Sequence, residues 1–287
     1  MATSEQEVLE RVRRFATARR EQFSSTLSWF ILERFMPRLA VSAAHENLAL
    51  HGDLMIHALM GGAPPYEWRA ELQRLGKAGS PDALALVKEV CAHMSNDFLR
   101  YEAKALPVID PPKGAAGSTR LFGLTGLLGP TECTVKLLIH EAEAMSLRPA
   151  DYHFRSSIEG LDGGRVKACP PPVVVAHLLY SLIGNGVAPG RQASYRGLRV
   201  LLESAQITEV DAVAAIRSVF SSRGASVPVR LPLALSEEIA ANATKEQVWQ
   251  AFQARARVTE PPFENTVRVL REALWPWLQQ AYAEERS

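Results

Sequence analysis

The chain has 287 residues, 47% of them hydrophobic and 22% charged, which is typical of a globular protein that buries a core. A net charge of +1 excludes a global attraction to nucleic acid, so a nucleic-acid contact would need a local basic patch. Three widely spaced cysteines exclude a disulfide framework, and the sequence has neither a signal-peptide core nor an apolar run of 18 residues, so a cytoplasmic protein is predicted.

The N-terminal segment has the apolar period of helices. Ser4 and Glu7 have the spacing of a capping box at the start of the first helix. A second apolar series, from Phe23 to Leu39, predicts a second helix. These residues therefore predict a helical start to the chain.

The next segments alternate between extended and helical patterns. "NLAL" predicts a short strand, and "DLMIHALM" predicts a helix. A loop rich in Gly and Pro (residues 61–66) leads to a second extended segment within "EWRAELQRLG". "SPDALALVKEVCAHM" then predicts a helix with Ser80 as its N-cap.

Three further runs have the composition of strands: "FLRYEAKALPVI", "TRLFGLTGLL" and "CTVKLLIHEA", separated by turn-rich "DPPKGAAGS" and "LGPTE". In the last run, apolar Val135, Leu137 and Ile139 alternate with Lys136 and His140, which predicts a strand with two distinct faces. Residues 147–172 are predicted to form an irregular connector.

From Val173 onward every segment has a helical pattern, and Thr244 and Gln247 have the spacing of a further capping box. No internal repeat is present. The order of elements predicts helices, then an α+β centre, then a helical C-terminal half.

The two ends of the chain resemble a known family. The run "ARREQFSSTLSWFILERFMPRLAVS...LALHGDLMIHAL" and the later "AAIRSVFSSRGASVP" and "WQAFQARA" resemble segments of the AbiEii-type nucleotidyltransferases, the toxin component of bacterial type IV toxin–antitoxin systems. The resemblance covers most of the chain. It implies an α+β fold, with a nucleotidyltransferase-like mixed sheet and N-terminal helices in residues 1–172 and a helical domain in residues 173–287.

The catalytic motifs of that family are altered here. Nucleotidyl transfer needs two or three carboxylates to hold Mg²⁺ between the triphosphate and the attacking hydroxyl. Where the family has a lysine before a glycine, this chain has His51 before Gly52. Glu71 and Gln73 replace an aspartate pair, and Leu138 stands at or within one residue of the third aspartate. The resemblance therefore implies a nucleotidyltransferase fold that has lost its metal-dependent transfer.

The remaining polar residues suggest another use of the same cleft. If the resemblance fixes the strand directions, Lys136 and His140 lie on the sheet face that carries Glu71 and Gln73. Lys and His beside a carboxylate suit proton transfer, and Lys or Arg can hold an anionic group. The predicted catalytic residues are Glu71, His140 and Lys136, and the predicted substrate- or phosphate-binding residues are His51, Gly52, Gln73 and Arg191. The alternative is a solvated strand face with a surface acid.

No metal site and no cofactor are predicted, because the seven histidines lack zinc-binding spacing. The N-terminal arginines, together with Arg34 and Arg38, form either a phosphate-binding stripe or an exposed surface of mixed charge. The C-terminal "LREALWPWLQQAY", with Trp275 and Trp277, predicts core packing or a protein partner.

Three functions remain open at this point. The first is a degenerate nucleotidyltransferase that acts in a protein assembly or on an anionic substrate. The second is a metal-independent enzyme that catalyses proton transfer, elimination or cyclisation in a specialised biosynthetic pathway. The third is an active nucleotidyltransferase toxin that acts on tRNA through displaced ligands.

Overall fold

The computed structural model describes residues 4–60, 69–76, 81–107, 119–141, 146–184 and 191–286. These residues divide into two compact units, of which the first ends at Cys169 and the second begins at Pro170 and also includes residues 146–148. The sequence predicts the boundary between residues 172 and 173. The predicted Gly/Pro-rich loop at 61–66 and the predicted turn at 110–118 lie outside the described residues.

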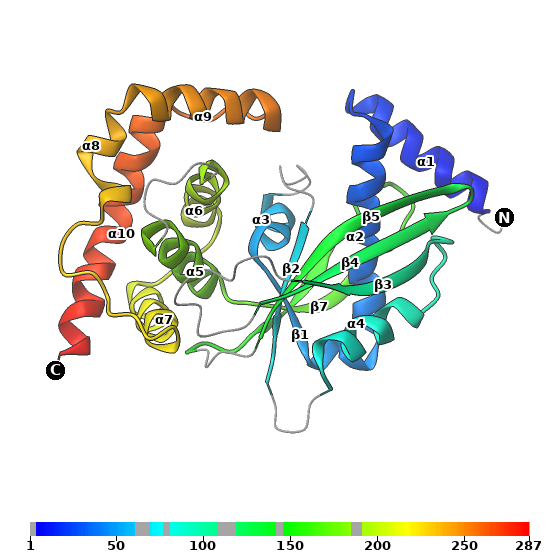
Figure 1. The fold of residues 1–287 in the computed structure, drawn as a ribbon, viewed down its shortest axis with the longest axis horizontal. Coiled ribbons are helices and arrows are strands. Elements are labelled where there is room, and N and C mark those ends of the chain that lie inside the picture. Colours follow the sequence, from blue (N-terminus) through cyan, green and yellow to red (C-terminus); the bar gives the residue numbers. More distant parts are fainter. Residues whose placement is uncertain are drawn as a thin grey trace. The chain divides into compact units, whose positions relative to one another are not determined.

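Two helices open the first unit, α1 (Glu5–Ala18) and α2 (Phe23–Val41), and both were predicted from apolar periodicity (Figure 1). The predicted capping box is confirmed, because Ser4 Oγ accepts from the Glu7 N–H while the Glu7 carboxylate accepts from the Ser4 N–H. A short 3₁₀ helix, Ala43–Glu46, follows α2.

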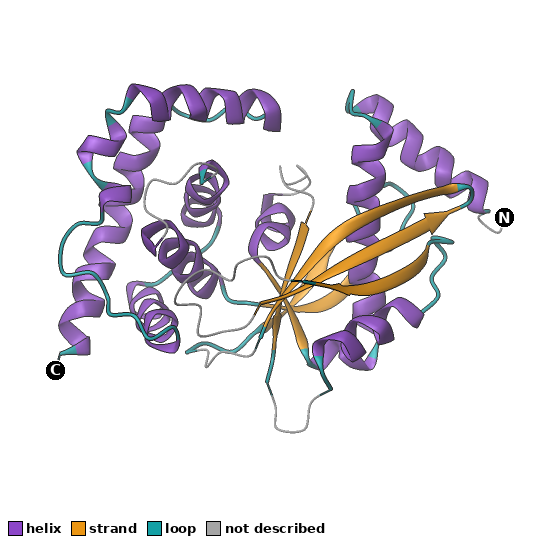
Figure 2. Cartoon of the chain, viewed as in Figure 1, coloured by secondary structure: helices purple, strands orange, loops and turns teal. Residues whose placement is uncertain are grey.

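A seven-stranded mixed sheet follows, in the order β3-β4-β5-β2-β1-β7-β6 (Figure 2). The strands are β1 (Leu48–His51), β2 (Arg69–Arg74), β3 (Arg100–Leu106), β4 (Thr119–Leu128), β5 (Thr131–His140), β6 (Ala150–Phe154) and β7 (Gly164–Ala168). The pairs β2/β5 and β1/β7 are parallel and the other neighbours are antiparallel. The α+β class predicted from the sequence is confirmed, and β1 and β2 lie inside the sheet.

The prediction of an irregular connector at 147–172 is wrong. This segment contains β6 and β7, and β7 pairs with the central strand β1 through Ala49↔Lys167 and Leu50↔Ala168. Each strand has five residues with charged or glycine positions among them, so neither shows a clear apolar period. Their strand state comes from long-range pairing.

The two faces of the sheet differ in character, as the alternation in β5 predicts. Leu50, Leu72 and Ile139 are register neighbours on one face, and all are buried. Helix α2 packs on that face, where a Cβ on Gly126 would come within 2.5 Å of Ile31. The opposite face carries the polar side chains of β1, β2 and β5.

Two further helices complete the first unit. Helix α3 (Gly52–Met60) follows β1 directly, and α4 (Ala83–Ala92) packs against β3. The N-cap of α4 is Asp82, which accepts from the Ala85 N–H. The predicted cap at Ser80 is therefore wrong, because a carboxylate closer to the helix satisfies its first N–H groups.

Arg34 and Arg38 do not form an exposed phosphate stripe. They lie one turn apart on α2 and are buried, with Arg34 Nε 3.0 Å from Asp97 Oδ2 and Arg38 Nη2 2.6 Å from Asp97 Oδ1. Asp97 also accepts from the Leu99 N–H, and the Arg38 guanidinium lies over the Tyr101 ring. These arginines hold α2 to the segment before β3.

The described part of the second unit is helical, as predicted. It comprises α5 (Pro171–Gly184), α6 (Gln192–Ser204), α7 (Glu209–Ser222), a 3₁₀ turn (Leu233–Leu235), α8 (Glu237–Ala240), α9 (Ala243–Ala256) and α10 (Phe263–Glu285). Leu274 and Leu278 of α10 are fully buried, whereas Trp275 and Trp277 are half-buried. None of the described helices is long and apolar enough to cross a membrane.

The predicted capping box at Thr244 is wrong. Asn242 is the N-cap of α9, and its side chain accepts from the Lys245 N–H. Thr244 is the second residue of α9, so it has the capping-box spacing to Gln247 but does not occupy the N-cap position. Asparagine two residues earlier is a cap of equal or better quality.

Candidate functional site

A group of polar side chains lies on the sheet face opposite α2. His51 is the last residue of β1 and stands directly opposite Glu71 of β2. Gln73, two residues further along β2, stands opposite His140 at the end of β5. His140 is thus a diagonal neighbour of Glu71, within reach of a long side chain. The sheet register therefore brings four predicted site residues together.

The Glu71 carboxylate lies between two imidazoles. His140 Nε2 is 3.2 Å from Glu71 Oε2, and His51 Nδ1 is 3.9 Å from the same oxygen. The two imidazole ring centroids are 5.2 Å apart. The side chains of His51, Glu71 and His140 are 4%, 13% and 19% exposed, so the cluster is largely withdrawn from water but open at the His140 side.

Gly52 is required by the shape of this cluster. Its φ is +57°, a left-handed conformation in which a side chain is strained, and α3 begins at this residue. A Cβ at this position would lie 2.4 Å from Glu71 Oε2. The predicted site glycine thus gives the carboxylate its space and turns the chain from β1 into α3.

The side chain of Gln73 forms hydrogen bonds with the backbone at the end of β5. It is buried, and its Nε2 donates to the carbonyls of Glu141 at 2.9 Å and His140 at 3.3 Å. A carboxylate in its place would face carbonyl oxygens without a proton to donate. Its Oε1 is buried and accepts no hydrogen bond from the described residues. Gln73 therefore fixes the end of β5, where His140 is located.

Thr119 joins the cluster and was not predicted. Its Oγ1 lies 3.2 Å from His140 Nδ1, so the two nitrogens of this imidazole face a hydroxyl and a carboxylate. Thr119 is the register partner of His140 in the β4–β5 hairpin. Counting residue pairs outward from the Gly129–Pro130 turn would have identified it.

Two predicted residues remain, Lys136 and Arg191. Lys136 is exposed and lies two residues before Leu138, the register partner of Glu71, just as His140 lies two residues after it. Arg191 belongs to the second unit, where it precedes α6 and its Nη1 donates to Ser181 Oγ at 3.2 Å. The contacts described for Glu71 are with His51 and His140, so the cluster is built from these three residues.

The donor set does not fit Mg²⁺. This ion prefers octahedral oxygen coordination, usually with carboxylates and phosphates. The cluster offers one carboxylate and two imidazoles, and Leu138 is the register partner of Glu71 on β5, where a further carboxylate would have been adjacent. Gln73, at the second position of the expected aspartate pair, carries an amide that donates to a backbone carbonyl and adds no carboxylate.

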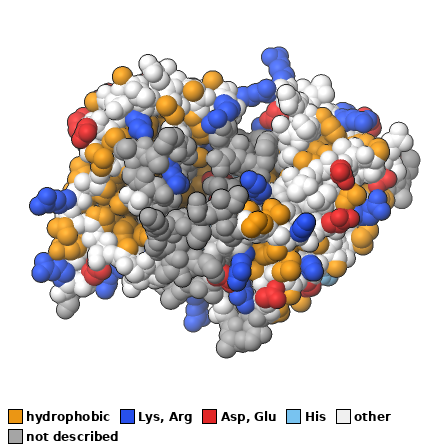
Figure 3. All heavy atoms as spheres, in the orientation of Figure 1, with side chains coloured by type: hydrophobic (Ala, Val, Ile, Leu, Met, Phe, Trp, Pro, Cys, Tyr) orange, Lys and Arg blue, Asp and Glu red, His pale blue; other side chains and the backbone are white. Residues whose placement is uncertain are grey.

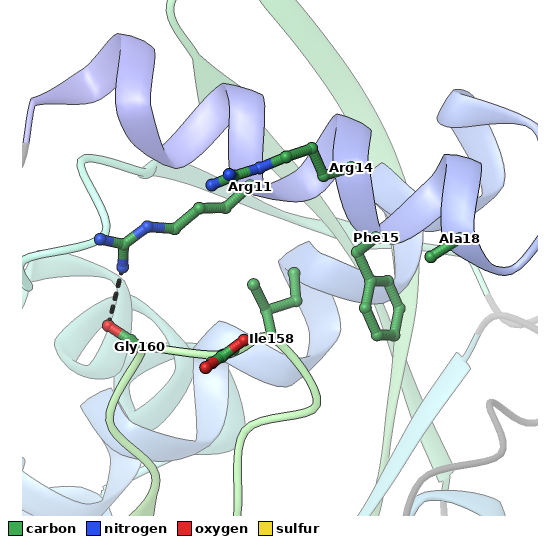
Figure 4. A pocket seen from close by; sticks show the side chains of 7 residues that line it. Arg11, Arg14, Phe15, Ala18, Ile158 and Gly160 are labelled. Carbon is green, nitrogen blue, oxygen red and sulfur yellow. Dashed lines mark hydrogen bonds between the residues drawn. The ribbon is translucent and has the colours of Figure 1, made fainter.

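A hollow of about 520 Å³ lies apart from this cluster, between α1 and the segment at 158–160 (Figure 4). Arg11 donates to the Gly160 carbonyl at 2.9 Å, and Arg14, Phe15 and Ile158 also line this hollow. Elsewhere on the N-terminal segment, Arg13 pairs with Glu10 and Arg19 with Glu21. These pairs favour a surface of mixed charge over a phosphate stripe, and Figure 3 shows acidic and basic side chains interspersed on the visible face of the molecule.

Two solved structures from Helicobacter pylori are similar to this chain. One is JHP933, with 11% sequence identity and a TM-score of 0.47, covering 89% of this chain and 92% of that one. The other is a proposed nucleotidyltransferase, with 11% identity and a TM-score of 0.48, covering 90% of this chain and 95% of that one. No family model matches the sequence, and no curated protein matches it. At these values the two structures carry no argument about function, so the residues of the cluster have to carry it.

Proposed function

We propose that this chain is a relative of the AbiEii-type nucleotidyltransferases that no longer transfers nucleotides through Mg²⁺. In its place, the His51–Glu71–His140 cluster catalyses proton transfer on a small polar substrate. The observation that carries the proposal is the hydrogen bond of 3.2 Å between Glu71 Oε2 and His140 Nε2.

His140 is the proton-transfer residue in this proposal. A carboxylate at one ring nitrogen fixes the orientation of an imidazole, as in other carboxylate–histidine pairs. The second nitrogen of His140 is within hydrogen-bond distance of Thr119 Oγ1. Glu71, His140 and Thr119 thus form a continuous chain along which a proton can be passed.

His51 assists from the other side of Glu71. It is the most buried member of the cluster, and its Nδ1 lies 3.9 Å from the shared carboxylate oxygen. When protonated, it favours the carboxylate form of Glu71, which is the form that accepts a hydrogen bond from His140. The predicted anion contacts of Lys136 and Arg191 stay predictions.

An active nucleotidyltransferase is disfavoured by the same residues. Glu71 has no second carboxylate at its register positions, because His51 and Leu138 stand on either side of it. A single carboxylate gives Mg²⁺ only weak, largely hydrated binding.

Solvent exchange tests the proposed proton transfer. Small carbonyl and carboxylate compounds with acidic C–H bonds are incubated with the protein in D₂O, and deuterium uptake is followed by NMR. We expect uptake by at least one compound with the wild type, and a loss of at least 100-fold in Glu71→Gln and His140→Gln. His93→Gln is the control, because His93 forms an exposed pair with Glu89 at 3.5 Å.

Nucleotide transfer is measured in parallel with labelled nucleoside triphosphates, Mg²⁺ and tRNA. The expected result is no incorporation above a protein-free control. Mg²⁺-dependent incorporation that Glu71→Gln abolishes would establish the nucleotidyltransferase alternative and refute the proposed function.

A further inference from the structure

We propose that His51, Glu71 and His140 bind one transition-metal ion of the zinc class. One ligand atom from each residue lies within 4.8 Å of the other two, which is close enough for a shared ion. The three residues come from three adjacent strands, β1, β2 and β5. This inference goes beyond the proposed proton transfer and does not depend on it, since metal binding is measured directly.

The distances fit a small ion. Ligand atoms about 2.0–2.1 Å from a tetrahedral Zn²⁺ are about 3.3 Å apart. Glu71 Oε2 and His140 Nε2 are already at 3.2 Å, and Glu71 Oε2 and His51 Nδ1 are at 3.9 Å. Side-chain rotations that bring the two imidazoles closer would give tetrahedral spacing of the ligand atoms. The backbone pairing of β1, β2 and β5 would not have to change.

The ligand types select the metal. Two imidazoles and one carboxylate are the ligands of zinc and neighbouring first-row metals, whereas Mg²⁺ and Ca²⁺ prefer oxygen. Three protein ligands leave a coordination position open for water or substrate, which is the arrangement of catalytic rather than structural zinc sites. The partial exposure of His140 gives an ion access from solvent.

The surroundings of the cluster hold its ligands in place. Thr119 Oγ1 lies 3.2 Å from His140 Nδ1, the ring nitrogen that would not face the metal. A hydrogen-bonding partner at that nitrogen fixes the tautomer and the orientation of a metal-binding histidine. Gln73 holds the backbone carbonyl of His140 and so fixes the end of β5.

Metal binding and proton transfer would compete. An ion bound to Glu71 Oε2 and His140 Nε2 occupies the two atoms whose hydrogen bond the proposed proton transfer uses. We therefore expect Zn²⁺ to inhibit solvent exchange in the wild type. This inhibition would follow from Zn²⁺ binding, but the metal site can be detected without it.

The test is direct titration of the full-length chain after treatment with a chelator. We expect calorimetry to show one equivalent of Zn²⁺ with a Kd of 10 μM or tighter, on the order of 7 kcal/mol, and Mg²⁺ to bind at least 100-fold more weakly. Glu71→Gln, His51→Gln and His140→Gln should each weaken Zn²⁺ binding at least tenfold. His93→Gln, which alters an exposed His–Glu pair, should leave it unchanged.

Co²⁺ provides a measurement on the unaltered protein. Bound Co²⁺ should give visible d–d bands without a sulfur charge-transfer band. Cys169 is the thiol to consider, because its backbone N–H donates to the carbonyl of Leu50 in β1, one residue before His51. Burial raises the pKa of this thiol to about 12, which opposes formation of the thiolate that a metal ion would bind. A thiolate band would assign the ion to cysteine and refute the proposed ligands.

The outcomes separate the two proposals. Stoichiometric Zn²⁺ binding that depends on Glu71 and His140 supports the metal site even if no compound exchanges deuterium. Absence of Zn²⁺ binding, or binding that all three variants retain, overturns it even if the chelator-treated protein catalyses exchange. If His51→Gln fails to fold, the Zn²⁺-induced rise in Tm of the wild type and its loss in Glu71→Gln distinguish the same two outcomes.

Discussion

Two charged clusters of the first unit differ in what surrounds them. Arg34, Arg38 and Asp97 are sealed between α2 and the segment before β3, with side chains that are at most 2% exposed. Glu71 and His140 lie on the other face of the sheet and keep partial exposure. Buried ion pairs without access to solvent can contribute only to the fold, whereas a partly exposed cluster can also meet a ligand.

The clusters also differ in how their members are arranged. Arg34 and Arg38 are one helical turn apart, and both bind the same carboxylate from opposite oxygens. Glu71 instead lies between two imidazoles, and both approach the same carboxylate oxygen. Removal of a charge should therefore cost stability in the first cluster and function in the second.

The largest expected effect is that of Asp97→Ala. Removing the carboxylate leaves two buried guanidinium groups uncompensated, so we expect the free energy of unfolding to fall by about 3–5 kcal/mol. Urea denaturation followed by circular dichroism measures it, with Glu102→Ala on the exposed side of β3 as control. A loss below about 1 kcal/mol would show that this cluster is not a stability element.

Gln73→Glu should have the next largest effect. The new carboxylate would face the carbonyl oxygens of His140 and Glu141 and lose the donor that binds them. We expect a loss of about 1–3 kcal/mol in the free energy of unfolding at neutral pH. Unchanged stability together with new Mg²⁺ binding would contradict this stabilising role of Gln73.

Gly52→Ala tests the space around Glu71. Alanine at a φ of +57° is strained, and its Cβ would press on Glu71 Oε2. We expect a loss of about 1–2 kcal/mol in stability, with a further loss of Zn²⁺ affinity as the carboxylate moves. Gly184→Ala is the matched control, because a Cβ there meets nothing within 4 Å. Equal effects of the two substitutions would refute the steric argument.

The smallest expected effect is that of Arg13→Ala. Arg13 and Glu10 form an ion pair at 2.7 Å, but their side chains are about half exposed. Pairs of this kind contribute roughly 0–1 kcal/mol, so thermal unfolding should show almost no change. A clear loss of stability would mean that α1 depends on its surface charges in the way that α2 depends on Asp97.

Much of the fold could be predicted from the sequence, because its signals are local. The apolar periods of α1, α2 and α10, the capping box at Ser4 and the alternation in β5 each lie within one segment. The missed strands β6 and β7 have no such signal, and they form because the edge of β1 is available for pairing. The cap at Asp82 shows the same limit on a smaller scale, since the sequence offers cap-type residues at both Ser80 and Asp82 and the structure places the cap at Asp82.

The site was only partly predictable for a related reason. Glu71 and His140 were identified because the family resemblance fixes the strand directions, and the register confirms that they share a face. Spacing along the chain gives no sign of the group formed by His51, Glu71 and His140, since these residues meet through strand pairing. Lys136 shares their face and is the other diagonal neighbour of Glu71, but its side chain is exposed.

The hydrogen bonds of Gln73 have a consequence for which side chains position 73 tolerates. An amide can donate to the carbonyls of His140 and Glu141, whereas a carboxylate of nearly the same shape cannot. The placement of the His140 imidazole therefore depends on an uncharged neighbour that takes no part in the proposed chemistry, and near-isosteric replacement is not neutral there.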